Sequence, residues 1–428
     1  MKKKYIIFFI VTLVLLVALI TSFNYFKTTN AYIDDSVNNQ TKITKGISMN
    51  LEQTAGAGNY KTVTRSSWPT EGYKFNAELS RCENGSTLSW DDTKKAVIVS
   101  GNLSDKCYVY FDIYQPTLAE YIKSQYTGTQ GDNALYYHNS TLTNGAGDNS
   151  YRYAGANPNN FVCFGSDASP CPIDNLYRII GVFGENYHGA NGKQLVKLIK
   201  YDYMTTDELG TDGDYSQTYK EWGMDSTYKG TYGDGERIGV YYWNYKATGS
   251  ATNTWSTSLL NKTNLNTNFI NNIGTTWANK IATVTWKVGG NTWANIGTKT
   301  SSVAYTNEIT NPVTTNTTDN ATTYSAKIGL MYVSDYGFAA SPDAWTLTMS
   351  SYNNTTATNN NWMYMGLYEW TISRRADFSN NAFFVGDDGR VSGSHVSYDY
   401  GVRASFNLES SVSYVSGSGS MSDPIVIN

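Results

Sequence analysis

The chain has 428 residues, of which 14% are aromatic and only 16% are charged, and its formal net charge at pH 7 is -4. Basic clusters are absent beyond the first few residues, which argues against nucleic acid as a partner. The charged fraction lies below the roughly one quarter typical of soluble domains. Tyr, Asn, Thr, Ser and Gly therefore form much of the surface, a composition typical of binding loops and also of extracellular β-proteins that have drifted in composition.

An uncharged apolar run over residues 5–20 follows three lysines. Its length is near the lower limit for a membrane-spanning helix and slightly above that of a secretory signal core. The sequence predicts an uncleaved signal anchor over residues 1–23, with the lysines in the cytoplasm and the rest of the chain outside. The alternative is a signal peptide cleaved after Ala31, which would make the protein secreted. Residues 24–50 are polar and aperiodic, which indicates a stalk.

Residues 51–115 contain short alternating or β-branched runs separated by turn dipeptides such as Asn-Gly. This pattern predicts a small β-domain. The remaining residues, 116–428, are predicted to form one larger domain that opens with a short amphipathic helix over 116–126.

Four cysteines follow the apolar run, at Cys82, Cys107, Cys163 and Cys171. An even number in an exported chain predicts two disulfides, with three possible pairings. We expect nearest-neighbour pairing, so that Cys82–Cys107 links two strands of the small β-domain and Cys163–Cys171 closes a short Gly/Ser/Pro loop. Zinc is the alternative, but the chain has no CxxC or paired histidines to support it.

Within the larger domain, two β-rich runs over 175–203 flank a turn and predict a hairpin. Apolar residues at helical spacing over 255–273 predict a pair of short helices. Residues 300–323 are predicted to be a polar insertion loop or hairpin. Four further sheet elements are then expected, within residues 326–339, 360–375, 381–391 and 400–409.

Three motifs in this domain carry a family resemblance: "YRIIGVF", then "WTIS", then "GVRASFNLESSV" before a Gly/Ser tail and "DPIVI". Their order resembles that in exported cell-surface proteins of gut Firmicutes and Mollicutes. Such domains look like distant relatives of the C-type-lectin-like fold found in formylglycine-generating enzymes and in variable-loop binding proteins. The resemblance covers residues 116–428 and departs at Ala404, where the family has proline.

The resemblance implies a C-type-lectin-like domain with a mostly antiparallel sheet, short helices and insertion loops. We therefore expect an α+β chain: an N-terminal transmembrane segment, a small all-β module with one disulfide, and the lectin-like domain. Trp362 and Trp370 are expected to be core or interface aromatics. Arg403 is expected to be structural, with its guanidinium anchoring loop carbonyls.

Enzymes of the resembling fold use cysteines near the end of the domain or a histidine triad. Here the last cysteine is Cys171, and His138, His188 and His395 are scattered along the chain. Thiolate or metal-based oxidation therefore lacks its ligands. No G-x-S-x-G motif supports a serine hydrolase. The sequence predicts a protein that is not an enzyme and uses no cofactor or metal.

One acidic stretch leaves calcium open as an alternative, because Asp202, Asp207, Asp212 and Asp214 lie close together in the chain. Calcium prefers several hard oxygen ligands from one flexible loop. The spacing matches no EF-hand, so a solvated turn is the expected structure.

Function is expected on loops carried by a rigid sheet. Antiparallel neighbouring strands would bring the candidate binding residues to one end of that sheet. These residues are Arg374, Arg375, Asp377, Phe378, Asn381, His395, Tyr398 and Tyr400. The alternative is that the two arginines only pair with Asp377 or Asp399.

The sequence predicts an exported, membrane-anchored cell-surface protein that binds an extracellular glycan or protein through these loops. The alternative is a structural coat or spacer protein without a specific ligand.

Overall fold

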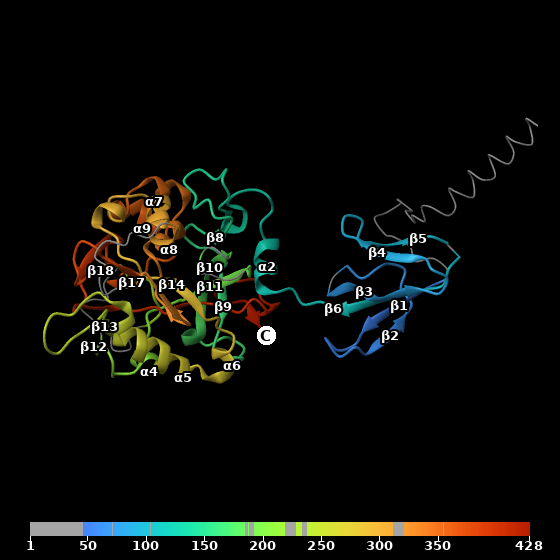
Figure 1. Cartoon of the computed structure of the whole chain (residues 1–428), viewed down its shortest axis with the longest axis horizontal. Helices are drawn as coiled ribbons and strands as arrows, with labels where there is room; N and C mark the ends of the chain where they lie inside the picture. Colours follow the sequence, from blue (N-terminus) through green and yellow to red (C-terminus); the bar gives the residue numbers. More distant parts are fainter. Residues whose placement is uncertain are drawn as a thin grey trace, which may run out of the picture. The chain divides into compact units, whose positions relative to one another are not determined.

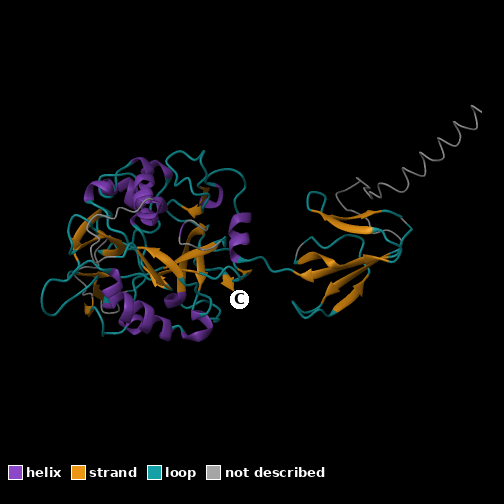
Figure 2. Cartoon of the chain, viewed as in Figure 1, coloured by secondary structure: helices purple, strands orange, loops and turns teal. Residues whose placement is uncertain are grey.

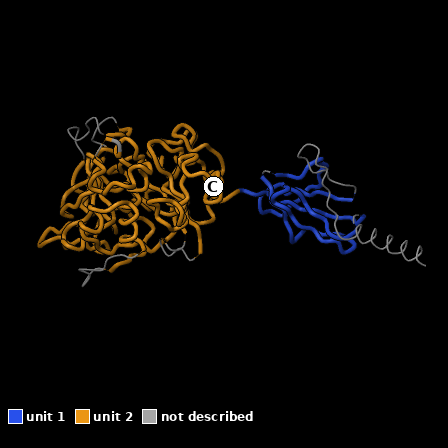
Figure 3. Tube along the Cα trace, turned by 90° about the horizontal axis from the view of Figure 1, so that it is seen from above, with its two compact units in different colours: residues 1–115 blue, residues 116–428 orange. Residues whose placement is uncertain are grey.

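The computed structural model describes residues 46–428 except 71, 103, 185–186, 188–191, 219–227, 233–237, 311–320 and 354. The chain forms two compact units: unit 1 ends at Gln115, and unit 2 begins at Pro116 (Figure 3).

Unit 1 is a small β-structure with a four-stranded sheet of order β2-β1-β6-β3 and a separate β4–β5 hairpin. In the sheet, β1 and β6 run parallel and the other neighbours run antiparallel. Its core packs around Phe111, which contacts the rings of Trp68, Phe75 and Trp90. The strands are β1 Ile47–Glu52, β2 Tyr60–Val63, β3 Tyr73–Cys82, β4 Thr87–Asp91, β5 Ala96–Ser100 and β6 Cys107–Ile113.

Both predicted disulfides are confirmed, Cys82–Cys107 in unit 1 and Cys163–Cys171 in unit 2. Cys82 and Cys107 lie directly opposite each other on β3 and β6. All four cysteines are bonded, and disulfides form and persist in oxidising compartments. The chain is therefore an extracellular or secreted protein.

The first sheet of unit 2 has seven antiparallel strands in the order β16-β21-β11-β10-β8-β7, with β9 also paired to β10. The predicted hairpin is present as β10 and β11, whose residues are all buried because protein covers both faces. The strands are β7 Leu135–Tyr137, β8 Tyr151–Tyr153, β9 Phe161–Cys163, β10 Leu176–Phe183, β11 Leu195–Lys200, β16 Ile328–Gly329 and β21 Ser405–Asn407.

The second sheet has six strands in the order β12-β13-β20-β17-β18-β19. We expected β17 and β20 to be antiparallel neighbours, but they run parallel through a pairing of Glu369 with Gly401. The strands are β12 Tyr215–Thr218, β13 Gly239–Tyr242, β17 Glu369–Arg374, β18 Asn381–Val385, β19 Val391–His395 and β20 Asp399–Gly401. Two more pairs complete the strands, β14 Val284–Lys287 with β15 Thr323–Ala326 and β22 Tyr414–Ser416 with β23 Val426–Ile427.

Short helices flank the strands of unit 2, with α7, α8 and α9 on one side and α4, α5 and α6 on the other (Figures 1 and 2). The α-helices are α2 Leu118–Ser124, α4 Thr206–Leu209, α5 Ile270–Asn272, α6 Gly274–Ala278, α7 Ser301–Tyr305, α8 Val333–Ala339 and α9 Thr355–Asn359. The 3₁₀ turns are η1 Asp132–Ala134, η2 Ile173–Asn175, η5 Trp255–Thr257, η7 Trp293–Asn295, η9 Pro342–Thr346 and η10 Met349–Ser351. Two segments are π-helical, η6 Leu260–Phe269 and η8 Thr306–Thr310.

The chain enters and leaves unit 2 at the same place. Thr117 forms an antiparallel bridge with Ser413, and the rings of Tyr121 and Tyr414 stack with centroids 3.6 Å apart. The last residue, Asn428, closes on the same point, because its side chain accepts a hydrogen bond from the Ser413 amide at 2.9 Å. The C-terminal tail therefore completes the domain beside its first helix.

Two elements differ from the sequence-based prediction. The expected polar insertion at 300–323 begins with helix α7, where Ala304 and Tyr305 are buried, although residues 311–320 lie outside the described residues. The run 326–339 was predicted as a sheet element, but it continues from the two residues of β16 into helix α8, in which every residue is buried. Most of this run is apolar, and the polar residues Ser334 and Asp335 within it are buried as well, so the pattern has no period that separates a strand from a buried helix.

The predicted fold class was wrong. No helix in the described part of the chain is long and apolar enough to cross a membrane. That part is a mixed, sheet-rich structure with 34% strand and 21% helix. Unit 2 is built on two separate sheets, whereas we expected one mostly antiparallel sheet. The transmembrane segment predicted for residues 1–23 lies outside the described residues.

Candidate functional site

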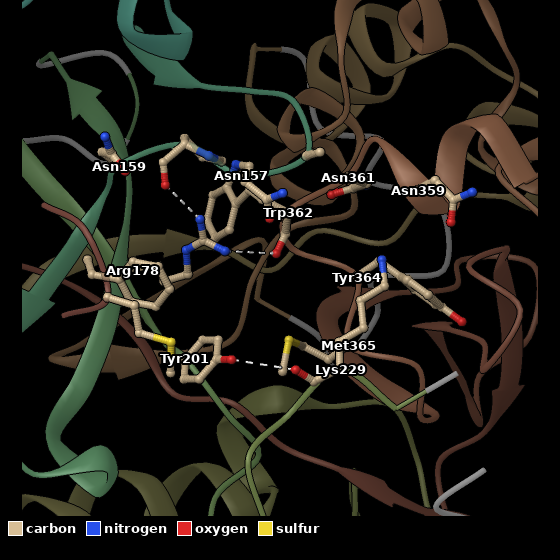
Figure 4. A pocket seen from close by; sticks show the side chains of 14 residues that line it. Asn157, Asn159, Arg178, Tyr201, Lys229, Asn359, Asn361, Trp362, Tyr364 and Met365 are labelled. Atoms are coloured by element: carbon tan, nitrogen blue, oxygen red, sulfur yellow. Dashed lines mark hydrogen bonds between the residues drawn. The ribbon is translucent and has the colours of Figure 1, made fainter. Parts of the chain in front are cut away.

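A pocket of about 610 Å³ opens in unit 2 between the loop before β9 and the segment that leads into β17 (Figure 4). Its volume falls in the range of small-ligand sites. Strand β10 contributes Arg178, and the residue directly after β11 is Tyr201. The full lining consists of Ala156, Asn157, Pro158, Asn159, Phe161, Arg178, Tyr201, Lys229, Asn359, Asn361, Trp362, Tyr364, Met365 and Met421.

Arg178 is held rigidly at the wall of this pocket and is only 6% exposed. Its guanidinium carbon lies 4.4 Å from the ring centroid of Phe161 and 4.6 Å from that of Trp362. Its Nε donates a hydrogen bond to the side-chain oxygen of Asn160 at 2.7 Å. The terminal nitrogens donate to the carbonyls of Pro158 at 3.0 Å and Trp362 at 3.4 Å. The guanidinium is therefore held in place by three hydrogen bonds and lies close to two aromatic rings.

The charge of Arg178 has no carboxylate partner among the described residues. Two other buried arginines differ in this respect, since Arg152 pairs with Asp148 at 2.8 Å and Arg403 with Glu369 at 2.8 Å. Burial lowers the pKa of Arg178 to about 9, and the nearby positive charge of Arg403 also lowers it. The side chain is still protonated at neutral pH, so the pocket wall carries a positive charge that no carboxylate of the described residues pairs with.

Trp362 supports both the pocket and the arginine. Its indole Nε1 donates to the carbonyl of Tyr153 and its backbone N–H to that of Gly155, each at 2.9 Å. The side chain is 3% exposed, so the sequence-based placement of Trp362 in the interior agrees with the structure, as does that of fully buried Trp370. The sequence did not indicate that Trp362 also lines a cavity.

The rim of the pocket is polar. Asn157, Asn159 and Asn359 are exposed, and hydrogen bonds from their side chains to other described residues are absent. Lys229 donates to the carbonyl of Thr358 at 2.8 Å and lies 4.8 Å from the ring centroid of Tyr364. Burial lowers the pKa of Lys229. A second pocket of about 270 Å³ shares residues 157–159 with the first.

Arg374, one of the predicted binding residues, points into the interior instead of the surface. It is 1% exposed, and its Nε donates to the carbonyl of Val288 at 3.1 Å. Both terminal nitrogens lack a hydrogen-bond partner among the described residues. Burial lowers the pKa of Arg374 to about 10. This side chain does not reach a ligand at the loop surface.

Arg375 and its neighbours do form a surface after β17. Arg375 pairs with Asp377 through contacts of 2.6 and 2.9 Å, as the alternative interpretation proposed. Its guanidinium carbon lies 4.6 Å from the ring centroid of Phe378, which is 52% exposed. The side chain also lies against Gly393 of β19, where a Cβ atom would come within 2.6 Å of it.

The other predicted residues lie on or after β18 and β19. Asn381 and His395 are directly opposed in that hairpin, and the two ring nitrogens of His395 contact the side chains of Asn380 and Ser397 at 2.8 and 2.6 Å. Tyr398 is 57% exposed, and its ring centroid lies 6.3 Å from that of His395.

Tyr400 is half-buried and packs against Trp370 and Phe384. The loop surface is therefore defined by Arg375, Asp377, Phe378, Asn381, His395 and Tyr398. Its role in binding stays a prediction.

Two of the four acidic residues considered for calcium, Asp214 and Asp202, accept several hydrogen bonds from other residues of the chain. Asp214 accepts hydrogen bonds from the amides of Tyr245, Leu259 and Leu260 at 2.8 to 3.1 Å. Asp202 accepts hydrogen bonds from the hydroxyls of Tyr228 and Thr231 and from the backbone N–H of Thr231. No group of three or more potential metal ligands occurs in the described part of the chain.

Two disulfide-bonded units, the larger with a polar pocket beside a buried guanidinium, define an extracellular protein of mixed, sheet-rich fold. In comparisons with known proteins, no family model, curated protein or solved structure matches the chain. The resemblance to exported proteins of Firmicutes and Mollicutes stays a prediction.

Proposed function

We propose that the protein is an extracellular binding protein that holds a glycan in the pocket beside Arg178. The observation that carries this proposal is the chemistry of the lining. Amide side chains at the rim both donate and accept hydrogen bonds, as glycan hydroxyls require. Trp362, Tyr201 and Tyr364 supply apolar ring surface next to polar groups.

Binding is favoured over catalysis by what the lining contains. None of the fourteen lining residues is an Asp, Glu, His, Cys, Ser or Thr. General acid-base and nucleophilic catalysis usually depend on those side chains. Lys229 and the tyrosines are the remaining titratable candidates besides Arg178, and burial raises the pKa of Tyr201 further above its usual range, with Asp202 adding to the effect.

Preorganisation also supports binding. Asn361 is fixed because its side chain donates to the carbonyl of Tyr336 and accepts from the amide of Met363, both at 2.9 Å. Together with the locked Arg178 and Trp362, it gives a wall that needs little ordering when a ligand enters. Affinity is gained when such entropy costs are small.

The proposal can be tested with a glycan array probed by the purified full chain. The pocket variant Asn157→Ala/Asn159→Ala changes only exposed rim residues, and we expect it to lose most retention while the melting temperature changes little. The matched variant is Arg375→Ala/Tyr398→Ala at the loop surface, which we expect to retain binding. Loss of binding only in the loop variant would place the site there. No retention on any glycan would favour a protein ligand or a coat or spacer role.

A further inference from the structure

We infer that the ligand of this pocket carries a carboxylate, as in an acidic saccharide, and that the carboxylate pairs with Arg178. The inference rests on the proposed function and adds the chemical class of the ligand. Its starting point is the contrast between Arg178 and the two paired arginines, Arg152 and Arg403.

Arg178 has donor capacity left for a ligand. A guanidinium has five N–H groups, and three hydrogen bonds from Arg178 go to Asn160, Pro158 and Trp362. One N–H on each terminal nitrogen therefore remains without a partner among the described residues. A buried charge is costly until it is paired, so an anion at this position gains both an ion pair and charge-assisted hydrogen bonds.

The geometry of the guanidinium suits a carboxylate. Its spare N–H groups lie on the two terminal nitrogens, and the ring centroids of Phe161 and Trp362 lie 4.4 and 4.6 Å from its central carbon. A carboxylate presents two oxygens in one plane and matches the planar fork of an arginine. Phosphate also binds this fork, so phosphorylated and sulfated saccharides are the competing ligands.

The surroundings indicate a saccharide as the carrier of the carboxylate. The pocket has room for more than one sugar ring, and exposed Asn157, Asn159 and Asn359 surround the opening. Lys229 adds a second cation at the rim, and the lining contains no carboxylate that would repel an acidic ligand.

The test varies the ligand, so that it does not depend on the folding of a variant. The full chain is titrated calorimetrically with trigalacturonic acid, a hyaluronan tetrasaccharide and sialyllactose, and with the methyl ester of each. Galactose 6-sulfate and galactose 6-phosphate are titrated in the same way. We expect at least one acid to bind roughly 10-fold or more tightly than its ester, since the acid forms charge-assisted hydrogen bonds that the neutral ester cannot form. Arg178→Gln should remove this preference, and Arg81→Gln, at an exposed arginine of unit 1, should preserve it.

The outcomes separate the inference from the proposed function. Equal binding of acid and ester at the pocket would overturn the carboxylate and leave glycan binding in place. A preference for sulfated or phosphorylated saccharides over all three acids would also overturn it. If no saccharide, acidic or neutral, binds, both the inference and the proposed function are wrong. If Arg178→Gln fails to fold, the ratio of acid to ester affinity in the unmodified chain decides whether a carboxylate is recognised.

Discussion

Arg178 and Arg403 are buried to a similar degree but differ in their counter-charges. Arg403 donates to both oxygens of Glu369, at 2.8 and 2.9 Å, and to the carbonyls of Tyr201 and Met363. Its expected role as an anchor of loop carbonyls is confirmed. Arg178 has the carbonyl contacts without a carboxylate partner in the part of the chain that the structure describes, and this charge is the one we assign to the ligand.

This contrast predicts different stabilities for two matched variants. Arg403→Met leaves Glu369 buried without a partner, and we expect a loss of about 3–5 kcal/mol in the free energy of unfolding. Arg178→Met leaves no carboxylate of the described residues without its partner, so it should cost less. Denaturant unfolding of the full chain measures both values. Equal losses would show that Arg178 contributes to folding as much as the paired arginine does.

A second prediction concerns pH. Burial alone raises the pKa of Asp148, but the Arg152 guanidinium and the Ser150 hydroxyl outweigh it and hold the pKa at about 2, below the ordinary 3.8. Because the folded pKa is depressed, the stabilisation is present above about pH 4 and is lost as the pH falls towards 2. The shift corresponds to about 2 kcal/mol.

We therefore expect Asp148→Asn to be less stable than the unmodified chain at pH 5, with the difference shrinking by about 2 kcal/mol near pH 2.5. Urea unfolding of both proteins at several pH values measures this difference in stability. Parallel curves for the two proteins across this range would contradict the assignment.

At the scale of elements, the sequence predicted features that depend on neighbouring residues. The β10–β11 hairpin followed from two apolar runs around a turn, and both disulfides followed from cysteine spacing. Helix α8 was missed because all of its side chains are buried and no polar face marks its period. Arg178 was missed although it is the one charged residue in an otherwise apolar buried strand, which was the available signal.

Arg178 was missed because one of its partners lies far from it along the chain. The hydrogen bond from Arg178 to Trp362 joins residues 184 positions apart, and no local pattern encodes such a contact. The loop surface was anticipated in part because Arg375, Phe378 and Asn381 follow one strand closely. Arg374, adjacent to them in sequence, turned out to lie on the other side of the strand.

The two disulfides should differ in their effect. They join residues 25 and 8 positions apart. On chain-entropy grounds the larger loop constrains the unfolded state by about 1 kcal/mol more. We expect Cys82→Ala/Cys107→Ala to destabilise unit 1 more than Cys163→Ala/Cys171→Ala destabilises unit 2. Scanning calorimetry of the full chain, with each transition assigned by the variants, measures this. A larger loss in unit 2 would indicate that native-state strain or packing outweighs loop entropy.

At the scale of the whole molecule, the low charge content and the disulfides agree with an extracellular or secreted protein, whereas the fold class could not be predicted. The sequence resemblance suggested one domain with one principal sheet. The structure has two sheets in unit 2, and β21, the last strand of the first, lies only four residues after β20 of the second. Which sheet a short strand joins is decided by long-range packing, for which the sequence holds no periodic signal.

Thr117, Ser413 and Asn428 lie close together, so the first and last residues of unit 2 can be joined and the chain opened at another place. Domains whose ends lie together tolerate circular permutation. If a short glycine linker joins residue 428 to residue 116 and the chain is opened within exposed residues 246–250, we expect unit 2 to fold with its near-ultraviolet circular dichroism unchanged. Opening it inside buried β10, between residues 179 and 180, should prevent folding. Such a permutant would present the Arg178 pocket from new attachment points, so the domain could be inserted into a host protein as a ligand-responsive module.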